Sequence, residues 1–123
     1  MNHMIMIMLK VLILCENSHT DNISEQAIGQ YQIRPIFVQD VNRIAGTSYR
    51  HKDARDERLA QAMIFTYLRH YGKAYERNTG KKATPTVLAM IFNRGPQGYR
   101  ATGPIALRYA RNAEKYFFQL SSK

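Results

Sequence analysis

The sequence predicts a mainly α protein that forms a single domain. Apolar residues recur at helical spacing in several separate segments, and proline or glycine stands at many of the expected segment ends. The chain of 123 residues has the length of one ordinary domain, residues 1–123, and no internal repeat, linker or low-complexity tract divides it. Hydrophobic residues make up 45% of the sequence, which is enough for a packed core.

Residues 4–15 (MIMIMLKVLILC) form an apolar run that only Lys10 interrupts. A transmembrane helix needs about 20 apolar residues, so this run is too short and we expect no transmembrane segment. Neither Asn2 nor His3 supplies the positive charge of a signal peptide, and no small-residue cleavage site follows, so we expect no clear signal peptide in this chain. We interpret the run as a buried helix, although its continuous apolar character permits a buried strand equally well.

A polar and aromatic stretch, residues 27–35 (AIGQYQIRP), follows a loop of turn-forming residues at 17–26. Gly29 permits a backbone conformation or a close approach that a side chain would obstruct. Gln32 offers both hydrogen-bond donors and acceptors, and Pro35 is tolerated at the start of a following helix. Such a stretch between helices suits the wall of a groove for a neutral ligand rich in hydroxyl and amide groups.

Two amphipathic helices are expected in the middle of the chain. The first follows Pro35 and stops at Gly46. After a polar connection at 47–54, the second has Asp56 and Glu57 at its start and Gly72 after its end. The apolar positions that define the second helix are Leu59, Ala60, Met63, Ile64, Tyr67, Leu68 and Tyr71.

Two further helices are expected after a polar, glycine-containing loop at 77–82. Thr84 and Pro85 have the pattern of an N-cap followed by proline at the first helical position. Residues 87–92 are apolar on all sides, which predicts a short central helix buried all round, and a loop rich in glycine and proline then runs to residue 104. The apolar stripe of the last helix consists of Ile105, Tyr109, Ala113, Tyr116, Phe117 and Leu120.

Charge and residue counts restrict the classes of partner and site. The net charge of +9 and the pI near 9.9 predict attraction to polyanions such as nucleic acid, anionic lipid or bacterial wall polymers. The arginines are spread over several segments without a basic run, so we expect no specific nucleic-acid partner. A single cysteine, Cys15, excludes an intrachain disulfide, and the four histidines lack ligand spacing, so we predict no metal site and no cofactor.

Four short motifs follow one another along the chain: residues 16–18 (ENS), residues 27–33 (AIGQYQI), residues 92–95 (FNRG) and Tyr109 in the last helix. Their order resembles the lytic transglycosylase and goose-type lysozyme family. The pattern of that family is a catalytic glutamate followed by serine at a helix end, a Gly-x-x-Gln-Ile segment, an aromatic-Asn-x-Gly segment and a late tyrosine. The resemblance extends from about residue 10 to residue 118.

The resemblance implies a lysozyme-like helical fold with a substrate groove, in which Glu16 is the catalytic acid. It implies that Gln32 and Asn93 line the groove and that Tyr109 leans toward the glutamate. Two glycines would hold backbone turns, and a tyrosine would border the groove where the family commonly has methionine. The substrate-binding residues implied in this way are Ser18, Gly29, Tyr31, Gln32, Asn93, Gly95 and Tyr109.

The expected position of Glu16 supports an acid role independently. At the C-terminal end of a helix, the negative pole of the helix dipole disfavours a further negative charge. Apolar neighbours such as Leu12 and Ile13 add desolvation, so we expect the pKa of Glu16 to be raised, as a general acid near neutral pH requires. A second carboxylate has only Asp21 and Glu25 as candidates, and the resemblance matches neither.

The expected function is therefore that of a peptidoglycan lytic transglycosylase. It would cleave the bond between N-acetylmuramic acid and N-acetylglucosamine with a single glutamate, leave 1,6-anhydro ends, and act as a monomer on glycan strands in the periplasm or outside the cell. Two alternatives stay open. Asn17 stands where the family commonly has serine, which allows a catalytically impaired peptidoglycan-binding protein of the same fold. The positive charge allows a basic helical nucleic-acid-binding protein.

Overall fold

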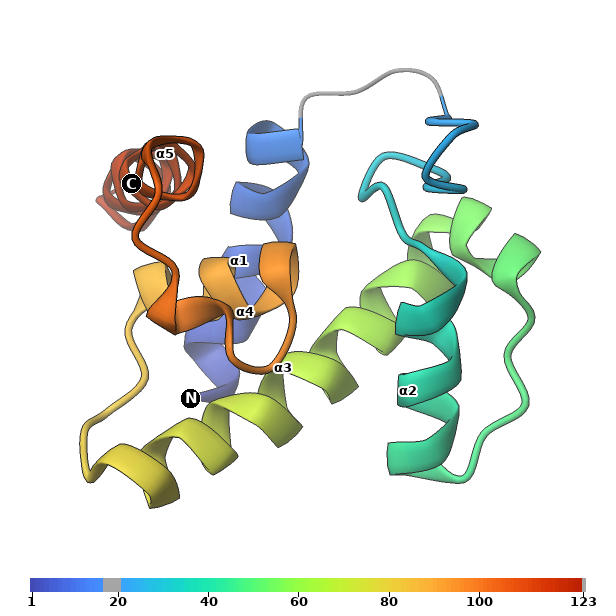
Figure 1. Ribbon diagram of the computed structural model, residues 1–123, viewed down its shortest axis with the longest axis horizontal. Helices are drawn as coiled ribbons and strands as arrows, with labels where there is room; N and C mark the ends of the chain where they lie inside the picture. The colour runs from blue at the N-terminus through green and yellow to red at the C-terminus, as the bar shows by residue number, and fades with distance from the viewer. Residues whose placement is uncertain (17–20, 123) are drawn as a thin grey trace.

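Five α-helices and two short 3-10 helices build the fold in the described part of the chain (Figure 1). The computed structural model describes residues 1–16 and 21–122, is 72% helical and has no strand among these residues. The prediction of a mainly α fold is confirmed. The elements are α1 (Asn2–Glu16), α2 (Pro35–Ala45), η1 (His51–Arg55), α3 (Glu57–Thr79), α4 (Pro85–Arg94), η2 (Gly98–Arg100) and α5 (Pro104–Ser121).

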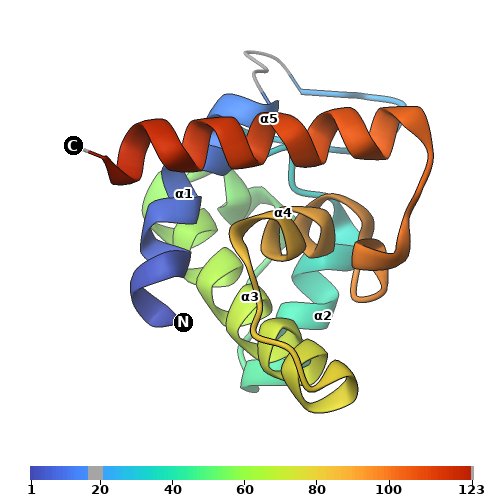
Figure 2. The same ribbon diagram turned by 90° about the vertical axis from the view of Figure 1, so that its left-hand side faces the viewer.

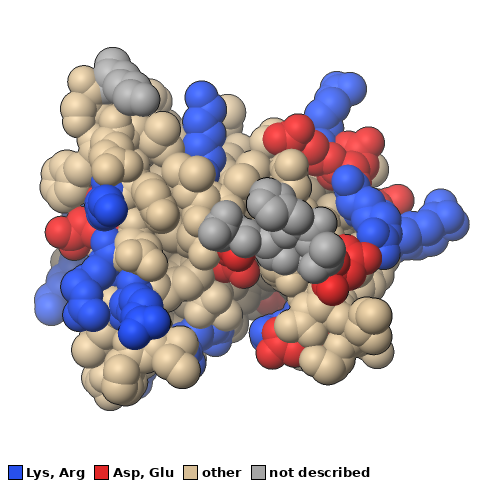
Figure 3. Space-filling model, turned by 90° about the horizontal axis from the view of Figure 1, so that it is seen from above, with Lys and Arg blue, Asp and Glu red and all other residues tan. Residues whose placement is uncertain are grey.

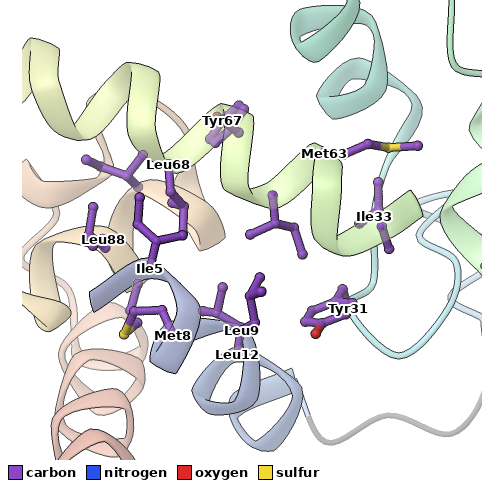
Figure 4. Close-up of a cluster of buried hydrophobic side chains, with 14 of the residues drawn as sticks. Ile5, Met8, Leu9, Leu12, Tyr31, Ile33, Met63, Tyr67, Leu68 and Leu88 are labelled. Carbon is purple, nitrogen blue, oxygen red and sulfur yellow. The ribbon is translucent and has the colours of Figure 1, made fainter. Parts of the chain in front are cut away.

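The N-terminal apolar run forms a helix and not a strand, the two structures that its sequence permits. Ile5, Met8 and Leu12 of α1 are fully buried at helical spacing. Figure 4 shows their side chains in one cluster with Leu68 of α3 and Leu88 of α4. The helix ends at residue 16, so the expected position of the glutamate at a helix C-terminus is confirmed. No helix in the described ranges is long and apolar enough to cross a membrane.

Helix α3 continues beyond the glycine at which the sequence predicts its end. It runs to Thr79 and ends at Gly80, so the prediction of a stop at Gly72 and of a loop from residue 77 is wrong. A β-carbon at Gly72 would lie 3.0 Å from the sulfur of Met1 and 3.1 Å from a methyl carbon of Leu88. The glycine therefore allows α1 and α4 to approach α3 closely, and this tertiary packing outweighs its low helix propensity.

Helix α5 packs through small residues. It lies across α1 and α4 (Figure 2) and buries Ala106, Ala110 and Ala113. Ile105, predicted on the buried stripe, is 79% exposed instead. Small alanine side chains let neighbouring helices approach closely, so the alanine face of α5 is the buried one, and Ile105 lies outside it.

Two tight turns occupy the described segment between α1 and α2. Single antiparallel bridges close them, Asn22 with Ala27 and Ile28 with Ile33. The side chain of His51 in η1 forms a hydrogen bond of 2.8 Å with the carbonyl oxygen of Ile33, which fixes the second turn. Helix α2 then packs against α3 (Figure 1), and α2 also borders a cleft.

The predicted helix boundaries at α2 and α4 are confirmed. Pro35 begins α2, and Gly46 caps its C-terminus in the left-handed conformation. Thr84 caps α4 by accepting a hydrogen bond of 3.1 Å from the backbone N–H of Val87.

Candidate active site

A cleft of about 710 Å³ separates α2 from the C-terminal end of α4. The turns at residues 22–34 complete its wall, and Glu16 reaches it from the end of α1. Figure 3, which views the molecule from above, shows a notch at the lower edge between the side that carries α5 and the side that carries α2. Charged and amide side chains alternate with aromatic and aliphatic ones along its walls, and a concave site of this size can hold a small molecule or part of an oligosaccharide.

The carboxylate of Glu16 is held by two side chains from distant parts of the sequence. The hydroxyl of Tyr109 on α5 donates a hydrogen bond of 2.6 Å to its Oε2 atom. The side chain of Asn93, in the last turn of α4, also forms a hydrogen bond with it. The structure thus brings together three of the predicted site residues, because α4 and α5 both pack against α1.

Burial dominates the electrostatics of Glu16. Desolvation raises its pKa above the ordinary value, and the negative charge of Glu25 adds to this effect. The hydrogen bonds from Tyr109 and Asn93 and the positive charge of Arg34 act in the opposite direction but do not cancel it. The pKa of Glu16 is therefore raised, as the sequence analysis expected.

Cys15 and Tyr109 beside the glutamate are poor nucleophiles. Burial and the neighbouring Glu16 charge raise the pKa of the Cys15 thiol to about 12. Burial first, and then the charge of Glu16, raise the pKa of Tyr109 as well. Both groups are protonated at neutral pH, so among these three residues Glu16 is the group suited to transfer protons.

Gln32 and Gly95 border the cleft together with Asn93. Gln32 has a positive φ of 53°, a conformation that side chains other than glycine adopt only at a cost. Its amide donates a hydrogen bond of 3.0 Å to the carbonyl oxygen of Gly29. Gly95 follows the end of α4, where its backbone N–H bonds to the carbonyl oxygen of Ile91 at 2.9 Å.

Gly29 and Tyr31 lie behind the cleft wall instead of in it. Gly29 has a φ of 75° and faces η1, and a β-carbon there would lie 2.8 Å from the backbone oxygen of Ala54. Tyr31 is 2% exposed in the core, and its hydroxyl accepts a hydrogen bond of 3.2 Å from Gln61. Both residues shape the turn that presents Gln32. Ser18 lies outside the described residues.

The structure separates the two candidates for a second carboxylate. Glu25 lines the cleft and forms an ion pair of 2.8 Å with Arg34, which also lines it. Asp21 instead accepts a hydrogen bond of 3.1 Å from the backbone N–H of Gly29 and pairs with Arg55 at 2.6 Å. These contacts lower the pKa of Asp21 and give it a structural role in the turn.

Sequence reasoning missed an aromatic row that extends from the cleft to Tyr71. Phe92 of α4 contacts Phe37 of α2 edge to face, with ring centroids 5.6 Å apart. Phe37 stacks on Tyr67 of α3 at 4.2 Å, and Tyr67 meets Tyr71 at 4.8 Å. Phe37, Tyr67 and Phe92 line the cleft. Phe92 belongs to the motif at residues 92–95, whereas Phe37 and Tyr67 appear in the sequence only as apolar helix positions, where no local signal separates cleft from core.

The charges that line the cleft balance when Glu16 is ionised. Its acidic residues are Glu16, Glu25 and Asp40, and its basic residues are Arg34, Arg43 and Arg94. The excess of positive charge in the chain therefore lies elsewhere, and Figure 3 shows Lys and Arg side chains on both sides of the molecule. In the part of the chain that the structure describes, no three His, Cys, Asp or Glu residues are grouped so that they could hold a metal ion.

Comparisons of this chain with protein-family models, with curated proteins and with solved structures found no match.

Proposed function

We propose that this protein is a peptidoglycan lytic transglycosylase that acts at the bacterial cell wall. The observation that carries the proposal is the environment of Glu16. Its carboxyl group borders an open cleft, its pKa is raised by burial, and Tyr109 and Asn93 fix its orientation. A buried, oriented carboxylic acid beside a cleft is what the protonation of a glycosidic oxygen requires.

In the first half of the reaction, protonated Glu16 donates its proton to the oxygen that joins N-acetylmuramic acid to N-acetylglucosamine. The bond between this oxygen and the anomeric carbon breaks, and the leaving sugar departs as an alcohol. The carbonyl oxygen of the N-acetyl group on the muramic acid supplies the electron pair that stabilises the anomeric carbon. Glu16 remains as a carboxylate and accepts the Tyr109 hydrogen bond.

In the second half, the Glu16 carboxylate acts as a base. It takes the proton of the C6 hydroxyl of the same muramic acid, whose oxygen attacks the anomeric carbon and displaces the N-acetyl oxygen. The product is a 1,6-anhydro ring, and Glu16 is protonated again. This route needs no second carboxylate, which agrees with the ion pair that holds Glu25 to Arg34.

The character of the cleft supports a sugar ligand over a nucleic acid. With Glu16 protonated, its lining carries a single net positive charge, whereas phosphate backbones are bound by a larger excess of Lys and Arg. Phe37 and Phe92 offer apolar surface to sugar rings, and Asn93 on the same cleft carries an amide suited to hydroxyl and N-acetyl groups. The positive charge outside the cleft favours adsorption to an anionic wall.

The test is incubation of the protein with purified peptidoglycan, followed by mass analysis of the soluble fragments. We expect fragments with 1,6-anhydro ends. Glu16→Gln keeps the size of the side chain and removes the transferable proton. It should lower the rate of fragment release by at least about 100-fold, while the circular dichroism spectrum stays that of the folded helical protein.

Glu25→Gln is the matched control, because it removes the other glutamate of the same cleft. It should release the same anhydro fragments as the parent protein. If the parent protein instead releases fragments with reducing ends and Glu25→Gln releases none, the protein is a hydrolase with Glu25 as its second carboxylate. Binding to the wall without release of any fragment would identify a binding protein, and binding to duplex nucleic acid without wall binding would contradict the proposal altogether.

A further inference from the structure

The described contacts include a second charged cluster on the cleft, formed by Asp40 and Arg43 of α2 with Tyr71 of α3. Arg43 donates to the Oδ1 atom of Asp40 through Nε at 3.0 Å and through Nη2 at 2.5 Å. The hydroxyl of Tyr71 donates to the other carboxylate oxygen of Asp40, and Arg43 donates to that hydroxyl at 3.0 Å. Two side chains, those of Asp40 and Tyr71, thus hold the guanidinium group of Arg43 in place.

This cluster is separated from the glutamate along the cleft. Ile36, Asp40 and Arg43 share one face of α2, and seven residues of a helix span about 10 Å along its axis. The aromatic row leads from Phe92, next to Asn93, through two further rings to Tyr71. One end of the cleft therefore has the proton donor, and the other has the fixed arginine.

The geometry leaves Arg43 able to bind a ligand. Its side chain is 64% exposed, whereas that of Asp40 is 21% exposed. Within the described part of the chain its contacts use Nε and Nη2, so the N–H groups of Nη1 are directed elsewhere. An exposed ion pair contributes little to stability, so stability alone gives weak reason for two side chains to fix this guanidinium.

We propose that Arg43 binds a carboxylate carried by the ligand that occupies the cleft. Asp40 and Tyr71 act as positioning residues that hold the guanidinium in one orientation, which lowers the entropy lost on binding. Arginine is suited to this task because its planar N–H groups match the geometry of a carboxylate.

This inference rests on the proposed function, which supplies the two sources of such a carboxylate. N-acetylmuramic acid has a lactyl group that ends in a carboxylate once peptides are removed. In intact strands this group is linked to a stem peptide, which carries carboxylates of its own. A strand of N-acetylglucosamine has neither and serves as the neutral reference.

The test measures the affinity of three soluble oligosaccharides of equal length by calorimetry: muropeptide strands, the same strands without peptides, and N-acetylglucosamine oligomers. Arg43→Gln should weaken binding of at least one carboxylate-bearing strand by about tenfold or more, because one charge-assisted hydrogen bond is lost. It should leave the affinity for the neutral oligomer unchanged. The strand that loses affinity identifies the source of the carboxylate.

Two further variants test whether the loss of affinity comes from the fixed orientation of Arg43 or from the loss of any positive charge in the cleft. Arg94→Gln removes another cationic side chain of the cleft and should cost clearly less than Arg43→Gln. Asp40→Asn keeps Arg43 charged but releases it, and should also weaken the carboxylate-bearing strand selectively. Circular dichroism verifies that each variant is folded.

Equal losses in Arg43→Gln and Arg94→Gln, or no loss in Arg43→Gln while glycans still bind, would overturn this inference and leave the proposed function standing. If none of the three oligosaccharides binds the parent protein, the proposed function fails and the inference fails with it.

Discussion

The hydroxyl of Tyr109 donates a hydrogen bond of 2.6 Å to Glu16, although 93 positions separate the two residues in the chain. The contact exists because α5 packs along α1, so the packing of two helices creates the site. Burial raises the pKa of both groups, and the hydrogen bond limits the rise at Glu16 by stabilising its charged form.

Tyr109→Phe should change the pH dependence of cleavage as well as its rate. Without the hydroxyl, the charged form of Glu16 is less stable, so its pKa rises further and the loss of activity at high pH moves to higher pH. Turnover should fall by about tenfold because the orientation of the carboxyl group is lost. The measurement is a pH–rate profile on solubilised glycan strands. Tyr116→Phe, a change at another partly buried tyrosine of α5, should leave the profile unchanged.

Glu16→Gln should make stability less dependent on pH. The pKa of Glu16 is higher in the folded protein than in the unfolded chain, so the folded protein binds the proton more tightly. The free energy of unfolding of the parent should therefore fall as pH rises from the unfolded pKa through the raised folded pKa. The variant lacks this contribution. Urea unfolding across this pH range should show similar stabilities at low pH and a more stable variant at high pH, and a difference that is constant with pH would contradict the raised pKa.

Helix boundaries were predictable from the sequence where local chemistry determines them. Pro35 and Gly46 delimit α2, and Thr84 begins α4 through its own side chain. Gly72 misleads because a glycine after a helix and a glycine inside one look alike in sequence. Only the approach of Met1 and Leu88 distinguishes them.

The candidate site was predictable in part. The resemblance to the lytic transglycosylase pattern implies Glu16, Asn93 and Tyr109, and the structure brings these three residues together. Tyr31 lies in the core, because nothing periodic in a short turn shows which side chain points inward. Phe37 was expected only as an apolar helix position, because an amphipathic pattern does not show how an apolar face is divided between core and cleft.

Gly29→Ala should destabilise the protein more than a glycine replacement of similar backbone conformation. Gly29 and Gly46 both have positive φ, of 75° and 67°, so each alanine variant carries about 1–2 kcal/mol of backbone strain. At Gly29 the new methyl group also meets the backbone oxygen of Ala54, which should add roughly 1–3 kcal/mol, whereas nothing lies within 4 Å at Gly46. Urea unfolding measures both, and equal losses would contradict the close approach of the turn to η1.

Salt should separate adsorption to the wall from recognition in the cleft. The net charge of +9 lies largely outside a cleft whose own charges balance. Adsorption to an anionic wall depends on charges exposed to solvent, so it should weaken strongly between low salt and about 1 M salt, where the screening length falls to about 3 Å. Binding of a neutral N-acetylglucosamine oligomer in the cleft depends on apolar and amide contacts and should change little. Cosedimentation with peptidoglycan and calorimetry with the oligomer give the two salt dependences. If oligomer binding fell as steeply as wall adsorption, positive charge would dominate recognition, and a polyanion would replace the neutral glycan as the expected ligand of the cleft.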